Sequence, residues 1–270
     1  MTTQKIKVAV AGARGKMGRE VVKMVLDDAA LQLVAAIDTV EGEDIGTAIG
    51  LPHCGVTTSS DLGMSLAQVQ PDVLVDFTVP QVAYSNTKVA LQHGVRPIVG
   101  TTGFTPEQIA QLKEYCEEHR IGALIAPNFS IGAILMMKFA AEASKYLPNV
   151  EIIEYHGDQK LDAPSGTAIK TAEKINEQRE EMRQGNIKEE ETIEGARGGY
   201  YHGFRIHSVR LPGVFAQQEV IFGGDGQTLK IRHDSYDRAG YMPGVNVAIK
   251  KVMHKEQLVY GFEHFLEDEQ

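Results

Sequence analysis

The segment Lys5-Ile-Lys-Val-Ala-Val-Ala-Gly12-Ala-Arg-Gly15-Lys-Met-Gly18 decides the fold of this chain. Its apolar first half predicts a strand over residues 5–11, and residues 16–27 follow with the apolar spacing of a helix. The glycines between them permit a tight turn, and the amides at a helix start can bind phosphate oxygens. This order of strand, turn and helix is typical of dinucleotide-binding folds.

Strands and helices continue to alternate after this unit, until the pattern changes near residue 128. The first part predicts strands over 31–38, 73–77, 97–100 and 121–126, with helices over 82–93 and 106–119. The second part predicts helices over 131–147, 167–183 and 244–253, a polar surface loop over 184–199, and strands over 150–155, 203–210, 217–223 and 228–234. Alternation favours a parallel sheet, whereas strands separated by turns favour a mixed or antiparallel one.

These patterns predict an α/β fold with two domains. Residues 1–129 form a Rossmann-like, doubly wound parallel sheet that binds a dinucleotide. Residues 130–239 form an α+β domain with a mixed or antiparallel sheet, which binds substrate and holds an oligomer together. Residues 240–270 are expected to pack back on the first domain.

The composition argues against several classes of protein. The chain has 27 Lys and Arg residues against 36 Asp and Glu, a net charge of −9, whereas a nucleic-acid-binding protein typically has a basic excess. Its two cysteines, Cys54 and Cys116, lack metal-ligand spacing, so we expect no metal site and a reducing compartment. No apolar run approaches the ~18 residues of a membrane span, and the N-terminus lacks the features of a signal peptide. We therefore expect a cytoplasmic protein that binds neither nucleic acid nor membrane.

A carboxylate follows the glycine turn at the distance that ribose binding requires. Gly12, Gly15 and Gly18 are spaced GxxGxxG, and Asp38 lies twenty residues after Gly18, at the end of the next strand. An acid there holds the ribose hydroxyls of an adenosine. The alternative is a purely structural turn, but the acid in this position favours a dinucleotide site.

The choice between NADH and NADPH stays open. Asp38 favours NADH, and Thr39 follows it where an arginine would bind an extra phosphate. Arg14, Lys16 and Arg19 could nevertheless approach that phosphate from the turn, unless they are solvated charges. We expect both cofactors to work.

Two later loops are predicted to reach the same crevice. Gly100-Thr-Thr-Gly103-Phe and Ala126-Pro-Asn-Phe129 each follow a predicted strand. Ligands of open α/β sheets bind beyond the carboxyl ends of the strands. These loops are therefore expected to touch the nicotinamide, although each could be an ordinary turn.

The segment Glu154-Tyr-His-Gly-Asp-Gln-Lys-Leu-Asp-Ala-Pro-Ser-Gly-Thr-Ala168 combines acid–base groups with an anion site. His156 or Lys160 alone would be a structural or solvated residue. Here they precede a helix start, in which Ser165 is the cap and Gly166 and Thr167 present amides to a carboxylate. Both side chains can deliver a proton near neutral pH. This combination suits the reduction of a small acidic molecule.

The run from His156 to Ala168 closely resembles the signature of the dihydrodipicolinate reductase family. Four more segments resemble motifs of that family in the same order: Gly12–Gly18, Gly100–Phe104, Ala126–Gly132 and Ser208–Arg210. The resemblance covers nearly the whole chain. It implies the NAD(P)H-dependent reduction of 4-hydroxy-tetrahydrodipicolinate, a cyclic dicarboxylate of the diaminopimelate route to lysine. It also implies a homotetramer built through the sheet of the second domain, and hinges between the domains that close on substrate.

The resemblance also implies roles for individual residues. His156 matches a proton donor or acceptor, Lys160 a proton donor, and Gly166 with Thr167 the site of a substrate carboxylate. Gly157 stands where many members have a second histidine that contacts substrate, so that Tyr155 or Lys160 could take over the contact. The residues that match cofactor contacts are Gly12, Ala13, Arg14, Gly15, Lys16, Met17, Asp38, Gly100, Thr101, Thr102, Ala126, Pro127, Asn128 and Phe129.

Two other functions fit part of the sequence. A protein that senses NAD(H) without chemistry would explain the glycine turn and Asp38 but not the pair His156 and Lys160. Another two-domain NAD(P)-dependent dehydrogenase, for instance one acting on amino-acid semialdehydes, would not be expected to carry the segment from His156 to Ala168. The sequence does not decide the effect of Gly157 on affinity, feedback control or the stability of the oligomer.

Overall fold

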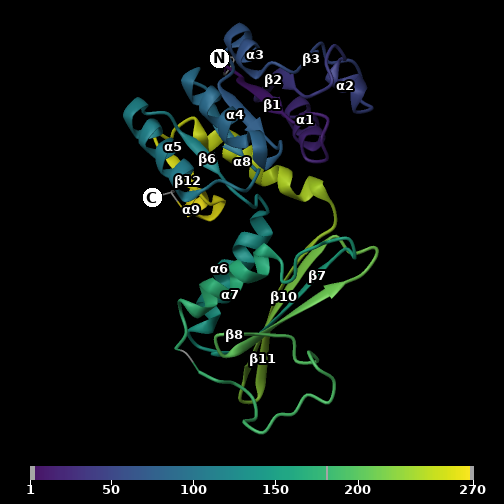
Figure 1. Ribbon diagram of the computed structural model, residues 1–270, viewed down its shortest axis with the longest axis vertical. Helices are drawn as coiled ribbons and strands as arrows, with labels where there is room; N and C mark the ends of the chain where they lie inside the picture. The colour runs from purple at the N-terminus through teal and green to yellow at the C-terminus, as the bar shows by residue number, and fades with distance from the viewer. Residues whose placement is uncertain (1–3, 181, 268–270) are drawn as a thin grey trace. The chain divides into compact units, whose positions relative to one another are not determined.

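A computed structural model describes residues 4–180 and 182–267 of the chain. The chain divides into two compact units (Figure 1). Unit 1 comprises the chain up to Ser130 and from Tyr241 onward, and unit 2 comprises Ile131–Gly240.

Unit 1 is built on a sheet of seven strands in which every pairing is parallel. In spatial order the strands are β12 (Leu258–Tyr260), β6 (Ala123–Ile125), β5 (Arg96–Val99), β4 (Val73–Asp76), β1 (Ile6–Ala11), β2 (Leu31–Ile37) and β3 (Thr58–Ser59). The central strands β1 and β4 are buried along most of their length, as expected of strands with helices on both faces. The prediction of a doubly wound parallel sheet is confirmed.

The helices of unit 1 begin and end at recognisable signals. They are α1 (Gly18–Asp27), α2 (Ile45–Ala48), α3 (Leu62–Val69), α4 (Pro80–Gln92), α5 (Pro106–His119), α8 (Met242–Val252) and α9 (Phe262–Glu267). Helix α5 has the predicted bounds because Thr105 and Gln108 form a capping box and Pro106 occupies its first turn. Helix α8 follows a 3₁₀ turn (Arg238–Tyr241), and Asn246 and Lys250 on it each bond Asp28 at 2.7 Å.

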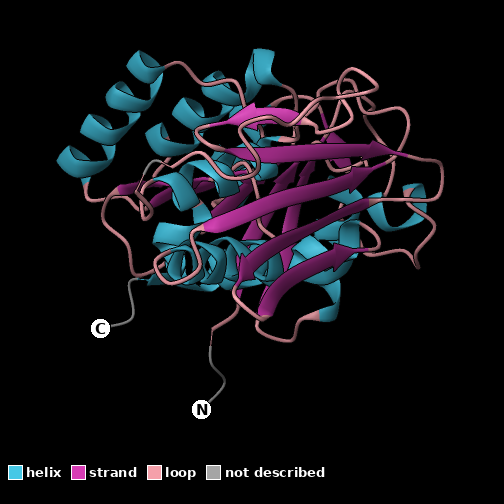
Figure 2. Ribbon diagram, turned by 90° about the horizontal axis from the view of Figure 1, so that it is seen from below, coloured by secondary structure: helices cyan, strands magenta, loops and turns pink. Residues whose placement is uncertain are grey.

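Unit 2 contains a five-stranded mixed sheet. Its spatial order is β11 (Gln227–Ser235), β10 (Ala216–Gly224), β7 (Asn149–His156), β9 (Phe204–Arg210) and β8 (Gly199–Tyr201). Only the pairing of β7 with β9 is parallel, so the prediction of a mixed or antiparallel sheet is confirmed. Helices α6 (Ile131–Ser144) and α7 (Gly166–Asn176) lie side by side over one face of it (Figure 1). Figure 2 shows the strands in magenta and the helices in cyan.

The predicted helix over 167–183 is wrong at its end, because α7 stops at Asn176. After the helix, the chain packs against the turn between β8 and β9. There Gly203 has a φ of +93°, and a Cβ on it would lie 2.0 Å from the Met182 carbonyl oxygen. Arg179 is buried at this crossing and donates to the same carbonyl oxygen at 2.9 Å. The predicted end of the preceding helix, 147, is also too late, since α6 stops at Ser144.

Several short elements have no counterpart in the sequence prediction. They are α2, β3, α3, β8, β12 and α9. No described helix is both long and apolar enough to cross a membrane.

The glycine turn suggests a test of packing. In Gly18→Ala the new Cβ would lie 1.9 Å from the Gly12 carbonyl oxygen, so backbone must move. We expect the free energy of unfolding in urea to fall by about 2 kcal/mol or more. Gly63→Ala is the matched control, because its Cβ would meet nothing closer than 3.6 Å and alanine favours a helix, by up to about 1 kcal/mol. Equal stability of the two variants would contradict the close packing of the turn.

Candidate functional site

The glycine turn of unit 1 is closed by contacts that leave no room for side chains. Gly12 has a φ of +73°, and a Cβ on it would lie 2.8 Å from the Phe77 carbonyl oxygen. The Gly15 amide donates to the Gly12 carbonyl oxygen at 2.9 Å. The turn therefore lies against the carboxyl end of β4 and leads directly into α1, which begins at Gly18.

The Asp38 carboxylate is held beside this turn. Its Oδ2 accepts from the Arg14 amide and its Oδ1 from the Thr39 amide, both at 2.8 Å. These two amides, with the Thr39 hydroxyl at 3.3 Å from Oδ1, fix the orientation of the carboxylate at the carboxyl end of β2. An acid fixed there can accept hydrogen bonds from ribose hydroxyls.

A cavity of about 580 Å³ opens beside Asp38. Its volume lies in the range of small-molecule sites, and apolar walls with a few polar groups are typical of them. It is lined by Gly12, Arg14, Gly15, Ile37, Asp38, Thr39, Ser60, Leu62, Phe77, Thr78, Val79, Val82 and Asn86. The residues from Ser60 to Asn86 are absent from the sequence prediction because the chain after β3 and β4, including helices α3 and α4, contributes them.

The predicted cofactor residues divide into two groups. Gly12, Arg14, Gly15 and Asp38 line the cavity, whereas the other members of the glycine turn, Ala13, Lys16 and Met17, do not. The other two predicted loops, Gly100–Thr102 and Ala126–Phe129, also do not line it.

Phe77 nevertheless connects these two loops to the cavity. A Cβ on Gly100 would lie 2.0 Å from the Phe77 ring, and the rings of Phe77 and Phe129 are 5.7 Å apart. The Thr101 hydroxyl donates to the carbonyl oxygen of Thr78, a lining residue, at 3.1 Å. The loops after β4, β5 and β6 thus meet at one edge of the sheet.

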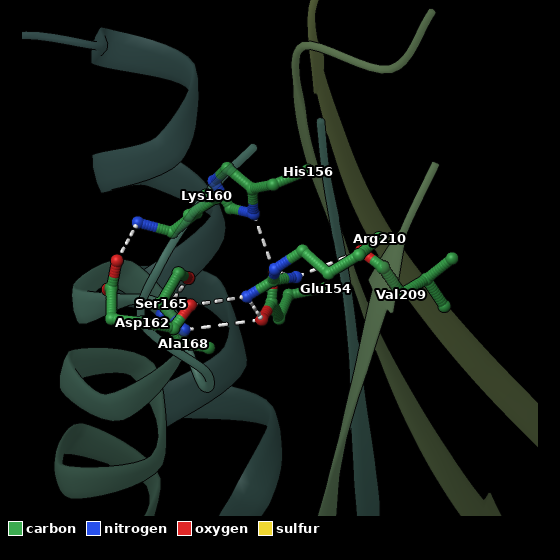
Figure 3. A network of polar contacts seen from close by, with 8 residues as sticks. All are labelled: Glu154, His156, Lys160, Asp162, Ser165, Ala168, Val209 and Arg210. Atoms are coloured by element: carbon green, nitrogen blue, oxygen red, sulfur yellow. Dashed lines mark hydrogen bonds and ion pairs between the residues drawn. The ribbon is translucent and has the colours of Figure 1, made fainter. Parts of the chain in front are cut away.

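Unit 2 holds a second polar cluster around Glu154, near the end of β7 (Figure 3). The Glu154 side chain is fully buried. Its Oε2 accepts from His156 Nδ1 at 2.5 Å and from Arg210 at 3.0 Å. Its Oε1 accepts from Arg210 at 2.7 Å and from the Ser165 amide at 3.2 Å. One carboxylate therefore joins strand β7, strand β9 and the start of helix α7.

The ionised form of Glu154 is the stable one in the folded chain. Burial raises the pKa of this carboxyl, but hydrogen bonds from His156, Arg210 and Ser208 outweigh burial and lower it to about 2. Because Glu154 accepts from Nδ1, the His156 ring directs Nε2 away from the carboxylate. A buried charge of this kind is stable only with such partners.

Lys160 has another partner. Its ammonium pairs with Asp162 at 2.7 Å, and in Figure 3 it points toward that carboxylate. Lys160 thus lies on the loop after β7, with its ammonium paired with the Asp162 carboxylate. The pair with Asp162 is partly exposed, so exchanging it for another anion costs little.

The start of α7 is built as the sequence predicts. Ser165 caps it, with its hydroxyl accepting from the Ala168 amide at 3.2 Å. Amides of the first turn have no acceptor within a helix, and the dipole there favours an anion. Gly166 is exposed, and a Cβ on it would meet nothing within 4 Å. A carboxylate can therefore approach the backbone at Gly166.

Gly157 offers no side chain to a ligand. Its backbone lies close to Val214, since a Cβ would be 3.3 Å from the Val214 carbonyl oxygen. Its own carbonyl oxygen accepts from the Lys160 amide at 3.1 Å. Gly157 therefore shapes the loop between His156 and Lys160.

The sequence prediction missed the roles of Glu154 and Arg210. Glu154 lies two residues before His156, which places both on one face of the strand, so a signal was available. Arg210 is next to His156 only through the pairing of β7 with β9, which single-sequence patterns do not reveal. Among residues 4–180 and 182–267, no group of three or more His, Cys, Asp or Glu is arranged to hold a metal ion.

Comparisons with known proteins agree with both halves of the chain. Residues 6–129 match the family described as dihydrodipicolinate reductase, N-terminus, and residues 132–266 match dihydrodipicolinate reductase, C-terminus. The 4-hydroxy-tetrahydrodipicolinate reductase of Listeria innocua is 57% identical over 97% of this chain and 100% of its own length. The enzyme of the same name from Bacillus pumilus is 54% identical over 99% of this chain and 100% of its own length.

Solved structures agree with the fold. A dipicolinate-bound dihydrodipicolinate reductase from Paenisporosarcina superimposes with a TM-score of 0.88 at 48% identity, covering 97% of this chain and 99% of that one. An amine dehydrogenase from Mycobacterium smegmatis shares only the fold, with a TM-score of 0.66 at 16% identity over 96% and 95%.

The lowered pKa of Glu154 predicts a pH dependence of stability. Because its folded pKa of about 2 lies below the ordinary 4.5, the ionised carboxylate stabilises the fold fully above pH 4.5. This contribution, up to about 3 kcal/mol, is lost as the pH falls toward 2. Free energies of unfolding measured from pH 6 to 3 should therefore fall more steeply for the native chain than for Glu154→Gln. Exposed Glu190→Gln is the control, and parallel curves for the native chain and Glu154→Gln would contradict the assignment.

Proposed function

Because the chain belongs to the dihydrodipicolinate reductase family, we propose that it reduces 4-hydroxy-tetrahydrodipicolinate to tetrahydrodipicolinate with NAD(P)H. This is a step of diaminopimelate and lysine biosynthesis. The observation that supports it most is that one buried carboxylate, Glu154, bonds both the imidazole of His156 and the capped start of α7. An acid–base group and an anion site are thereby built as one unit.

We assign the cofactor site to unit 1. When bound, the reduced nicotinamide supplies the hydride. We assign the backbone of Gly12–Met17 to the pyrophosphate and Asp38 to the adenosine ribose. Gly100–Thr102 and Ala126–Phe129 are assigned to the nicotinamide half, because they follow neighbouring strands at the same edge. Use of both NADH and NADPH is part of this proposal.

We assign the substrate site to unit 2. A relative of similar fold binds dipicolinate, a cyclic dicarboxylate. We assign the amides of Gly166 and Thr167 to one substrate carboxylate, and Lys160 to the same anion once it leaves Asp162. Gly157 borders this site through its backbone and leaves the contact of the missing histidine to Lys160 or Tyr155.

Two side chains supply the acid–base chemistry. Water leaves the substrate, and hydride addition at C4 of the conjugated imine gives an enamine, whose carbon must gain a proton. His156, oriented by Glu154, and Lys160 are the donors that we assign. Arg210 balances the charge of Glu154 and also donates to the Asp162 carbonyl oxygen at 2.8 Å, so we assign it a positioning role.

The assembly is also proposed. We propose that the chain forms a homotetramer through the face of the five-stranded sheet opposite α6 and α7. We also propose that the protein is cytoplasmic. The domain functions are proposed likewise, with cofactor binding in unit 1 and substrate binding and assembly in unit 2.

Two alternative functions, another NAD(P)-dependent dehydrogenase and an NAD(H) sensor without catalysis, have less support. Dehydrogenases of other substrates resemble this chain at only 10–16% identity, which shows fold alone. A sensor without chemistry would not need the contacts of Glu154 with His156 and Arg210.

Removing both proton donors tests the proposed chemistry. In His156→Ala with Lys160→Ala, we expect turnover of the cyclic substrate to fall by about 10³-fold or more, since each group donates near the substrate. Binding of NADH, measured by fluorescence titration, should stay within about twofold, because neither residue lies in unit 1. Gln159→Ala, an exposed neighbour, is the control. Full turnover in the double variant would refute the assignment.

Gly166 tests the carboxylate site. Gly166→Ala should fold normally, because the added methyl meets only open space. It should raise KM for the substrate by about tenfold, with a smaller change in kcat, since it obstructs the carboxylate. Steady-state kinetics at saturating NADH measure both constants, and an unchanged KM would place the carboxylate elsewhere.

A further inference from the structure

Glu43, the ion-pair partner of the cavity-lining Arg14, is positioned to influence the choice between NADH and NADPH. This inference rests on the proposed dinucleotide site and concerns the corner beside Asp38. Arg14 lines the cavity there, and its guanidinium forms an ion pair with Glu43. Its backbone amide meanwhile bonds Asp38 at 2.8 Å. Arg14 is therefore anchored at both ends by carboxylates.

The backbone of Glu43 is itself fixed. Its amide donates to the Thr58 hydroxyl at 3.2 Å, and its carbonyl oxygen accepts from the Thr58 amide at 2.8 Å. Thr58 is buried in β3. The next residue, Asp44, accepts from the amides of Thr47, Cys54 and Gly55, which ties the following loop together. The counter-ion of Arg14 is thus supplied by an ordered part of the fold.

This arrangement works against an extra phosphate. NADPH differs from NADH by a phosphate of about −2 charge on the adenosine ribose. That group would enter beside the Asp38 carboxylate, and Arg14 could neutralise it only by leaving Glu43. Of the two other basic residues at the turn, Arg19 donates to the Arg14 carbonyl oxygen at 3.1 Å, while Lys16 is exposed and has no ion-pair partner among the described residues. We propose that Glu43 is a specificity-determining residue that favours NADH by holding Arg14.

Binding of cofactor fragments tests this directly. Adenosine 2′,5′-bisphosphate and 5′-ADP are titrated calorimetrically into the native chain and Glu43→Gln at low salt, where exposed charges are least screened. We expect affinity for the 2′-phosphate fragment to rise about three- to tenfold in the variant, while that for 5′-ADP changes by less than about twofold. The ratio of kcat/KM for NADPH to that for NADH should rise in the same direction.

Two further variants separate Arg14 from general charge. Glu41→Gln removes the same charge from a residue bonded to Ser60 instead, and should leave the ratio of fragment affinities unchanged. When Glu43→Gln is combined with Arg14→Met, the gain in affinity for the 2′-phosphate fragment should disappear. An equal gain in Glu41→Gln, or no gain in Glu43→Gln, would overturn the inference while the dinucleotide site stands. Failure of the native chain to bind either fragment would overturn the proposed site, and this inference with it.

Discussion

The second unit depends on one buried charge. Glu154 lies on the face of β7 that packs against helices, where an unpaired carboxylate would be strongly destabilising. Its partners, His156, Arg210 and the Ser165 amide, come from three different elements. Satisfying this carboxylate therefore fixes the imidazole and the helix start together, as the proposed acid–base group and anion site require.

The site in unit 1 depends on close backbone packing rather than on a buried charge. There the constraint is steric: Gly12 and Gly18 let the turn close on itself, and Gly100 lets the next loop pass Phe77. Polar groups such as Asp38 are then fixed by backbone amides that this packing presents. A backbone built this closely can present amides to phosphates without side chains in the way. In the proposed function, unit 1 binds the reductant and unit 2 binds the acidic ring.

The sequence predicted what local rules control. The glycine turn and the capped start of α7 could be predicted because each depends on residues close in sequence. Asp38 could be predicted because its spacing from the glycine turn is typical of a dinucleotide-binding unit, although its contact with the Arg14 amide spans 24 residues. Strand β12 was missed because three residues carry little periodicity, and its place beside β6 comes from tertiary packing. Helix α3 was missed although Asp61 caps it. The role of Arg210 was beyond reach, since it follows from the register of β7 against β9. The predicted catalytic and cofactor residues remain predictions.

A crystal structure of the chain with dipicolinate tests the central claim most directly. The account predicts one carboxylate of the ligand within hydrogen-bond distance of the Gly166 and Thr167 amides, with His156 still bonded to Glu154 through Nδ1. A ligand seated away from the start of α7, or an imidazole that has left Glu154 while the ligand is bound, would contradict it.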